Sequence, residues 1–106
     1  MLKVTFVVYE KSGLDRAEAL RYWRDTHGPI GAKIPGLQRY VQQHAIAAPE
    51  GDPPFLGVAT LTFADEDAFG VAAASPEFAA AVADLDNFAD AQRLPTAFVD
   101  EVVIVG

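Results

Sequence analysis

The chain has 106 residues, of which 51% are hydrophobic and 22% charged, and its formal net charge is −7. This composition predicts one globular domain over residues 1–106, and the acidic balance argues against nucleic acid and membrane surfaces as partners. The absence of cysteine excludes disulfides, thiolate catalysis and cysteine-ligated metals. Because no stretch has the pattern of a signal or a membrane span, we expect a cytoplasmic protein.

The first two predicted elements are a strand over residues 2–9 and a helix from about Asp15. The strand alternates apolar side chains on one face with partly apolar ones on the other. Asp15 and Glu18 have the spacing of a capping box, which begins the helix. Gly28 and Pro29 are expected to end it at His27, because the residue before a proline is pushed out of helical geometry.

Two strands with a long connection are predicted next, over residues 37–46 and 57–63. The first places polar side chains on one face, which is unusual for a strand of a small domain. The connection, residues 47–55, contains three prolines and a glycine, and we interpret it as a stiffened hairpin loop and as the best candidate for a lid.

The last third of the sequence predicts two short helices and a final strand. Asp65 caps a helix that runs to about Ala73, and Ser75 followed by Pro76 begins a second one. Residues 86–95 are expected to form a loop, and residues 98–105 a fourth strand that is apolar on both faces.

The element order predicts an α+β fold, a ferredoxin-like βαββαβ sandwich. Its four-stranded antiparallel sheet has two helical regions on one face. The first and last strands are nevertheless apolar on both faces, so the uncovered face needs a partner. We therefore expect a homodimer with sheets back to back, burying more than about 1,200 Å² in total.

Three segments carry a resemblance to a known family: YWRDTHGP in the first helix, PGLQRYVQQH in the second strand, and NFAD followed by VDEVVIV near the end. They resemble the EthD family of dimeric α/β barrel proteins. The most specific part is a Tyr-Trp pair followed by His and Pro, here Tyr22, Trp23, His27 and Pro29. The resemblance spans nearly the whole chain. It implies a barrel of two protomers, a pocket between helices and sheet in each, and kinship with cofactor-free monooxygenases, muconolactone isomerases and polyketide cyclases.

His27 is the candidate catalytic residue. On a helix, Leu20, Trp23 and His27 share one face, so the imidazole points inward at the helix end, where it is suited to general acid or base chemistry near neutral pH. The alternative is a structural histidine that binds a carbonyl of its own last turn. The emission of Trp23, one turn away, is expected to titrate near pH 6 to 7 only if His27 changes charge.

The candidate substrate-binding residues are mostly aromatic. Trp23 is interpreted as core and pocket wall rather than chemistry. His44 and Tyr40 share a face of the second predicted strand, which either lines the pocket or meets solvent at a sheet edge. Weaker candidates are Tyr9, Tyr22 and Phe88.

No metal site and no cofactor are expected. The acidic residues near the end of the chain lack the spacing of a calcium loop and are interpreted as a solvated face. The two histidines do not form a zinc or iron motif. A third reading of the function is a porphyrin-binding protein with His27 or His44 as axial ligand. The acidic residues are Asp84, Asp86, Asp90, Asp100 and Glu101.

Two classes of function follow. The first is a cofactor-independent enzyme that acts on a small hydrophobic or aromatic compound in a degradative or biosynthetic pathway. Oxygenation, isomerisation and cyclisation all fit, with His27 moving the proton; the resemblance adds the oxidoreductase label and the ether degradation for which the family is named. The second is a non-catalytic binding protein of such a pathway. An opening of His27 onto a cavity would favour the first.

Overall fold

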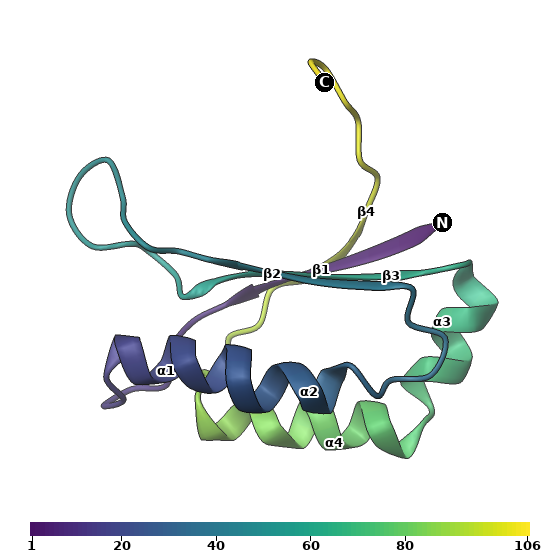
Figure 1. Cartoon of the computed structure of the whole chain (residues 1–106), viewed down its shortest axis with the longest axis horizontal. Coiled ribbons are helices and arrows are strands. Elements are labelled where there is room, and N and C mark those ends of the chain that lie inside the picture. Colours follow the sequence, from purple (N-terminus) through teal and green to yellow (C-terminus); the bar gives the residue numbers. More distant parts are fainter.

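The computed structural model describes all 106 residues and contains one sheet of four antiparallel strands in the order β2-β3-β1-β4. Helices cover one face of this sheet, and the other face is open (Figure 1). The topology is the ferredoxin-like sandwich that the element order predicts. The elements are β1 (Leu2–Val8), α1 (Arg16–Tyr22), η1 (Trp23–His27), α2 (Gly28–Gly31), β2 (Arg39–His44), β3 (Gly57–Phe63), α3 (Glu66–Ala73), α4 (Pro76–Asp84), η2 (Leu85–Asn87) and β4 (Thr96–Val99).

Local capping signals locate the helix starts well. The carboxylate of Asp15 accepts from the backbone N–H of Glu18, and Asp65 and Ser75 accept in the same way at the starts of α3 and α4. Each cap satisfies a backbone donor that the first turn would otherwise leave unpaired. The predicted starts of these three helices are therefore confirmed.

The first helix does not end at Gly28 and Pro29, as the sequence predicted. It continues through η1, a π-helical turn, into α2. The backbone N–H of Gly28 donates to the carbonyl of Trp23, five residues back. A proline normally clashes with the carbonyl four residues before it, and we attribute the wider turn to the relief of that clash.

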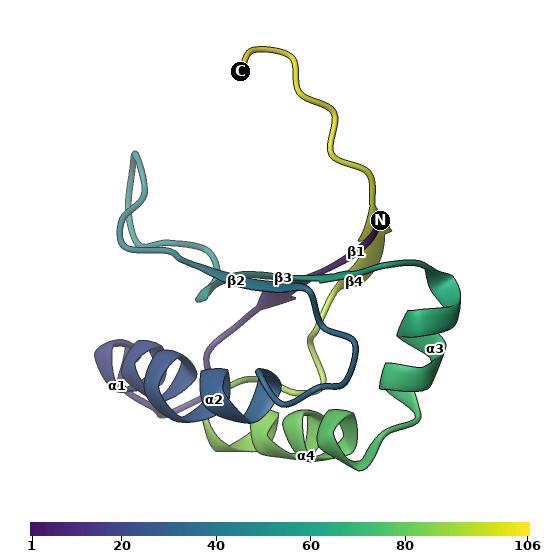
Figure 2. The same cartoon turned by 45° about the vertical axis from the view of Figure 1, so that its right-hand side comes forward.

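The fourth strand is much shorter than predicted and begins earlier. Residue 99 pairs with Lys3 of β1, and only Leu2 and Met1 remain beyond it. Because the neighbouring strand runs out, residues 100–106 have no backbone partner within the chain, despite their high strand propensity. In both views they extend away from the helical layer as an arm, the C-terminal arm (Figure 2).

The loop between β2 and β3 also rises on the side of the sheet opposite the helices (Figures 1 and 2). Its base is fastened to α1, because Arg16 donates to the carbonyls of Ala45 and Phe55 at 2.8 and 2.7 Å. The interpretation of residues 47–55 as a lid is wrong, since the cavity described below lies on the helical side and none of these residues lines it.

The core lies between the sheet and the helices in two adjoining clusters. One is built around Trp23, Leu56 and Phe88, and the other around Val4 and Phe63. No single helix is long and apolar enough to span a membrane; α3 and α4 pass such a test only as a pair, and they are bent by 70°.

Candidate functional site

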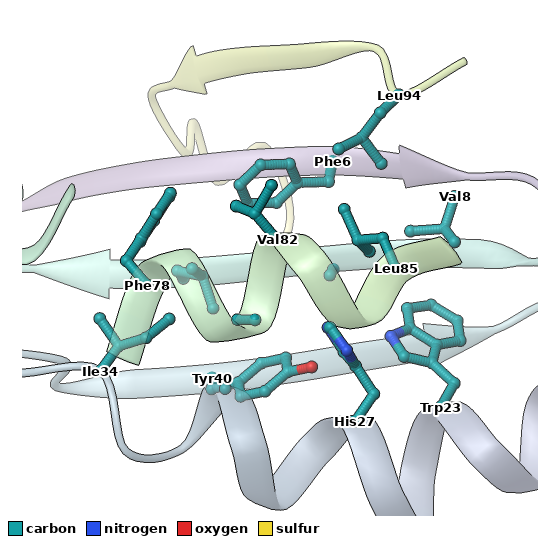
Figure 3. Close-up of a pocket in the computed structure, with 14 residues that line it drawn as sticks. Phe6, Val8, Trp23, His27, Ile34, Tyr40, Phe78, Val82, Leu85 and Leu94 are labelled. Carbon is teal, nitrogen blue, oxygen red and sulfur yellow. The ribbon is translucent and has the colours of Figure 1, made fainter. Parts of the chain in front are cut away.

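A cavity of about 120 Å³ lies between α4 and the sheet, and its lining is almost wholly apolar (Figure 3). Val82 lines it and is 51% exposed, so the cavity opens to solvent beside α4. An apolar cavity of about 150 Å³ binds benzene, which sets the scale here at one ring or a short chain. The lining residues are Phe6, Val8, Trp23, His27, Gly31, Ile34, Tyr40, Ala59, Leu61, Phe78, Ala81, Val82, Leu85 and Leu94.

The π-helical turn η1 aims two of these side chains, Trp23 at its start and His27 at its end, toward the cavity. Besides the backbone N–H of Gly28, Gln42 of β2 donates to the carbonyl of Trp23, at 2.9 Å. Turns of this kind occur mostly as single insertions in α-helices and often at functional sites. The turn therefore ties the edge strand to the part of the helix that carries the histidine.

His27 is paired with Asp84, at the end of α4. Its Nδ1 lies 2.8 Å from Oδ2 of Asp84, and the two residues are 7% and 9% exposed. The alternative reading, in which His27 binds a carbonyl of its own last turn, is wrong. The interpretation of Asp84 as part of a solvated acidic face is also wrong, because Asp84 is buried and both oxygens of its carboxylate accept hydrogen bonds from side chains.

Two further side chains hold the Asp84 carboxylate. Tyr22 donates its hydroxyl to Oδ1 at 2.6 Å, and Asn87 donates its amide to the same oxygen at 2.9 Å. Burial raises the pKa of Asp84, but the hydrogen bonds from Tyr22, Asn87 and His27 outweigh it and bring the pKa below its ordinary value. Asp84 is thus ionised at neutral pH, and its hydrogen bond raises the pKa of Tyr22.

An ionised Asp84 fixes the tautomer of His27. The carboxylate can only accept, so Nδ1 must carry the hydrogen, and Nε2 of the neutral ring is left with its lone pair. Nε2 has no hydrogen-bond partner in the protein, yet it is not a sealed, unpaired atom. It opens on the cavity that the ring lines. A proton acceptor therefore stands in an apolar chamber, oriented by a carboxylate behind it.

Trp23 is fixed by contacts on its ring faces and its edge. The imidazole of His44 stacks on the indole at 4.7 Å and 7°, and Phe88 packs at 6.3 Å. A side chain at Gly57 of β3 would collide with the six-membered ring of the indole and with the carbonyl of Gln43. Only glycine at this position allows the tryptophan to approach the sheet so closely.

Tyr40 approaches the cavity from β2 across the backbone of α2. A side chain at Gly31 would come within 2.9 Å of the tyrosine ring, so the missing side chain there makes room for it. The Tyr40 oxygen accepts from Nε2 of Gln42 at 2.7 Å. In Figure 3 the hydroxyl points toward His27.

The structure therefore brings together three of the residues singled out in the sequence, Trp23, His27 and Tyr40. Phe88 is fully buried behind them, 4.8 Å from the His27 ring, and does not line the cavity. His44 covers the far side of Trp23, outside the cavity. Tyr9 is also elsewhere, with Arg93 3.7 Å above its ring.

Asp84 is the site residue that sequence reasoning missed. A signal did exist, because it lies three residues after Ala81, on the side of α4 that carries buried positions. No group of three or more His, Cys, Asp or Glu side chains is arranged to hold a metal ion.

The fold and the site together define a class: a ferredoxin-like α+β protein with a small apolar cavity between helices and sheet and a histidine at its inner wall. Residues 11–92 match the model of the EthD domain, and the chain belongs to the EthD family. No match was found among curated proteins.

Solved structures from several bacteria share the fold. An ethyl tert-butyl ether D (EthD) family protein from Bacillus halodurans has a TM-score of 0.78 and 24% identity, over 96% of this chain and 100% of that one. A Dabb family protein with a ferredoxin-like fold, from Mesorhizobium loti, has a TM-score of 0.71 and 20% identity, over 95% of this chain and 96% of that one. A dimeric ferredoxin-like protein of unknown function from Thermobifida fusca has a TM-score of 0.71 and 12% identity, over 92% of this chain and 88% of that one.

Proposed function

We propose that this protein binds a small hydrophobic or aromatic compound in the cavity and catalyses a proton transfer on it, with His27 as the general acid or base. One observation carries the proposal: Nδ1 of His27 is held by the ionised Asp84 while Nε2 opens on an apolar chamber. A base oriented by a hydrogen-bonded carboxylate is the arrangement that proton-transfer enzymes share. Asp84 acts here as a positioning residue.

The proposed reaction draws on the chain's own residues and needs no cofactor. Proton transfer is common to oxygenation, isomerisation and cyclisation, the three reaction types suggested by the family resemblance. An oxidoreductase acting in ether degradation, the role for which the family is named, is one member of this range. The cavity volume favours substrates of about one ring.

The test replaces His27 with Gln, which keeps the size and hydrogen-bonding capacity of the side chain but cannot titrate. Binding of a one-ring probe such as toluene should stay within about threefold of wild type. Turnover of a substrate found by metabolite screening should fall about 10² to 10⁴-fold, the usual worth of a general acid or base. Full retention of turnover would refute the proposal.

A non-catalytic binding protein of such a pathway is the second candidate. It is favoured by the lining of the cavity, of which 12 of 14 residues are hydrophobic, because burial of apolar surface alone provides affinity. In that case His27 and Asp84 serve to join α4 to the first helix. Replacing either would lower stability and leave the transfer of ligand to a downstream enzyme unchanged.

We also propose that two copies form a homodimer through the open face of the sheet and the C-terminal arm. The side chains of Val102, Val103, Ile104 and Val105 are 66 to 94% exposed. Such a run of large apolar side chains with no cover is expected at an interface. The dimeric Thermobifida fusca protein shares the fold and supports this assembly.

A further inference from the structure

Three polar groups open on the otherwise apolar cavity. Nε2 of His27 is one, and it has no hydrogen-bond partner in the protein. The second is Nε1 of Trp23, whose N–H is directed toward the Tyr40 oxygen. The third is the hydroxyl hydrogen of Tyr40. Figure 3 shows the indole nitrogen and the Tyr40 hydroxyl on either side of the His27 ring.

The free hydrogen of Tyr40 follows from the orientation of the Gln42 amide. The carbonyl of Trp23 can only accept, so the end of the amide that faces it must be the nitrogen. The same nitrogen faces the Tyr40 oxygen, and the amide oxygen is 2.8 Å from Nε2 of His44. Both amide hydrogens are thereby used, and Tyr40 accepts one of them. Its own hydrogen is left to donate elsewhere.

The Tyr40 hydroxyl stays protonated at neutral pH, because burial raises its pKa and the hydrogen bonds from Gln42 and Trp23 lower the pKa by less. The Tyr40 oxygen accepts from both neighbours, so its O–H is the neutral donor that the cavity offers close to one acceptor, His27. A donor beside a base is suited to a compound with an oxygen that accepts and a neighbouring carbon that loses a proton.

We propose that the substrate is a small neutral carbonyl compound, whose oxygen accepts from the Tyr40 hydroxyl while Nε2 of His27 removes a proton from the carbon next to the carbonyl. The proposal rests on the proposed function and specifies its substrate class. No lysine or arginine lines the cavity, which is why the compound is neutral rather than a carboxylate. Its apolar remainder extends toward Phe6 and Val82.

The step balances without any other reactant. The C–H bond breaks and an N–H bond forms at Nε2, while the C–H electron pair forms a carbon–carbon double bond and the carbonyl π pair moves to oxygen. The resulting enolate oxygen keeps the hydrogen bond from Tyr40, and Asp84 faces the imidazolium. Return of the proton to the same carbon regenerates the ketone, and return to a conjugated carbon gives an isomer.

The experiment follows hydrogen exchange at the α-carbons of cyclohexanone in D₂O by NMR. Wild-type protein should accelerate the exchange over buffer, and His27→Gln should abolish the acceleration. Tyr40→Phe should reduce it about 10² to 10³-fold, the usual effect of losing one donor to a developing oxyanion. Tyr9→Phe, which removes a hydroxyl remote from the cavity, is the matched control and should exchange like wild type.

Binding provides the second measurement, with methylenecyclohexane as a probe of the same shape that lacks the oxygen. Wild type should prefer cyclohexanone, and Tyr40→Phe should lose that preference while binding methylenecyclohexane normally, which also shows that the variant is folded. If Tyr40→Phe keeps both exchange and preference while His27→Gln loses exchange, the carbonyl proposal fails and the proposed function stands. If wild type binds both probes but accelerates no exchange, the carbonyl proposal also fails. If neither probe binds, both proposals fail.

Discussion

Nδ1 of His27 and Oδ2 of Asp84, 57 residues apart in the chain, lie 2.8 Å from one another between the first helix and α4. Both residues are almost fully buried, and each supplies a hydrogen-bond partner that the other needs away from water. Tyr22 and Asn87 fill the second carboxylate oxygen. The contact thus joins the first helix to α4, and it also orients the opposite edge of the imidazole toward the cavity.

The first prediction concerns stability in acid. The pKa of Asp84 is lower in the folded protein than in the unfolded chain, so the unfolded state binds the proton more readily. The stabilisation from Asp84 is complete above the unfolded pKa, about 3.9, and is lost as the pH falls through the lower folded value. Chemical denaturation between pH 2 and 7 should show this loss.

Asp84→Asn should remove that acid-dependent part of the stability and lower the stability at pH 7. Tyr22→Phe, which deletes one donor to the carboxylate, should reduce the acid-dependent part without removing it. An Asp84→Asn protein with the same pH dependence as wild type would show that the carboxylate is not held as described.

The second prediction concerns the fluorescence of Trp23. His44 stacks on the indole, and its pKa is lowered by burial and by the charge of Arg24. Emission should therefore change as His44 becomes an imidazolium, with a midpoint below about 6.5. His44→Gln should remove the transition, and His27→Gln should not. Because His44 contacts the indole directly, a pH-dependent change in emission does not by itself identify His27 as the titrating group. Loss of the transition in His27→Gln alone would identify it.

The third prediction compares two glycines. Gly57→Ala would place a methyl group against the Trp23 ring and the backbone of Gln43, and should destabilise the fold by about 1 to 3 kcal/mol. Gly70→Ala meets nothing within 4 Å and lies inside α3, so it should stabilise by about 0.5 to 1 kcal/mol. Urea unfolding measures both. Equal stability of the two variants would mean that Trp23 does not pack against β3.

Features encoded by neighbouring residues were predictable from the sequence. Asp65 and Ser75 act on donors in their own first turns, and β3 has the predicted bounds because its alternation is unbroken. The strand order follows from the order of helices and strands along the chain. These are effects that a window of about ten residues contains.

The features that were not predicted depend on distant partners. The sequence does not distinguish Asp84 from the other acidic residues near it, because its partners Tyr22 and His27 are distant in the chain. From the sequence alone, Pro29 predicts a helix end. Only the packed structure shows that a wider turn accommodates the proline and that Gln42 donates to the carbonyl of Trp23 in that turn. The fourth strand reads as long, because its length is set by where β1 ends. In each case a contact with residues distant in the sequence overrides the preference of the local segment.

The last prediction concerns the C-terminal arm. Val103→Asp places a charge among the exposed apolar side chains, and if the arm is buried by a second copy the dimer should dissociate. Light scattering at micromolar concentration should then give the mass of one chain, where wild type gives twice that mass. The matched control is Val71→Asp on α3, because Val71 is 69% exposed and Val103 66%, yet α3 lies on the helical side of the sheet, away from the open face (Figure 2). The control should remain a dimer.

Val7→Asp should also dissociate the dimer, because Phe6 lines the cavity and its neighbour Val7 therefore points to the open face of the sheet. A wild-type monomer, or dissociation by Val71→Asp and not by Val103→Asp, would rule out this interface.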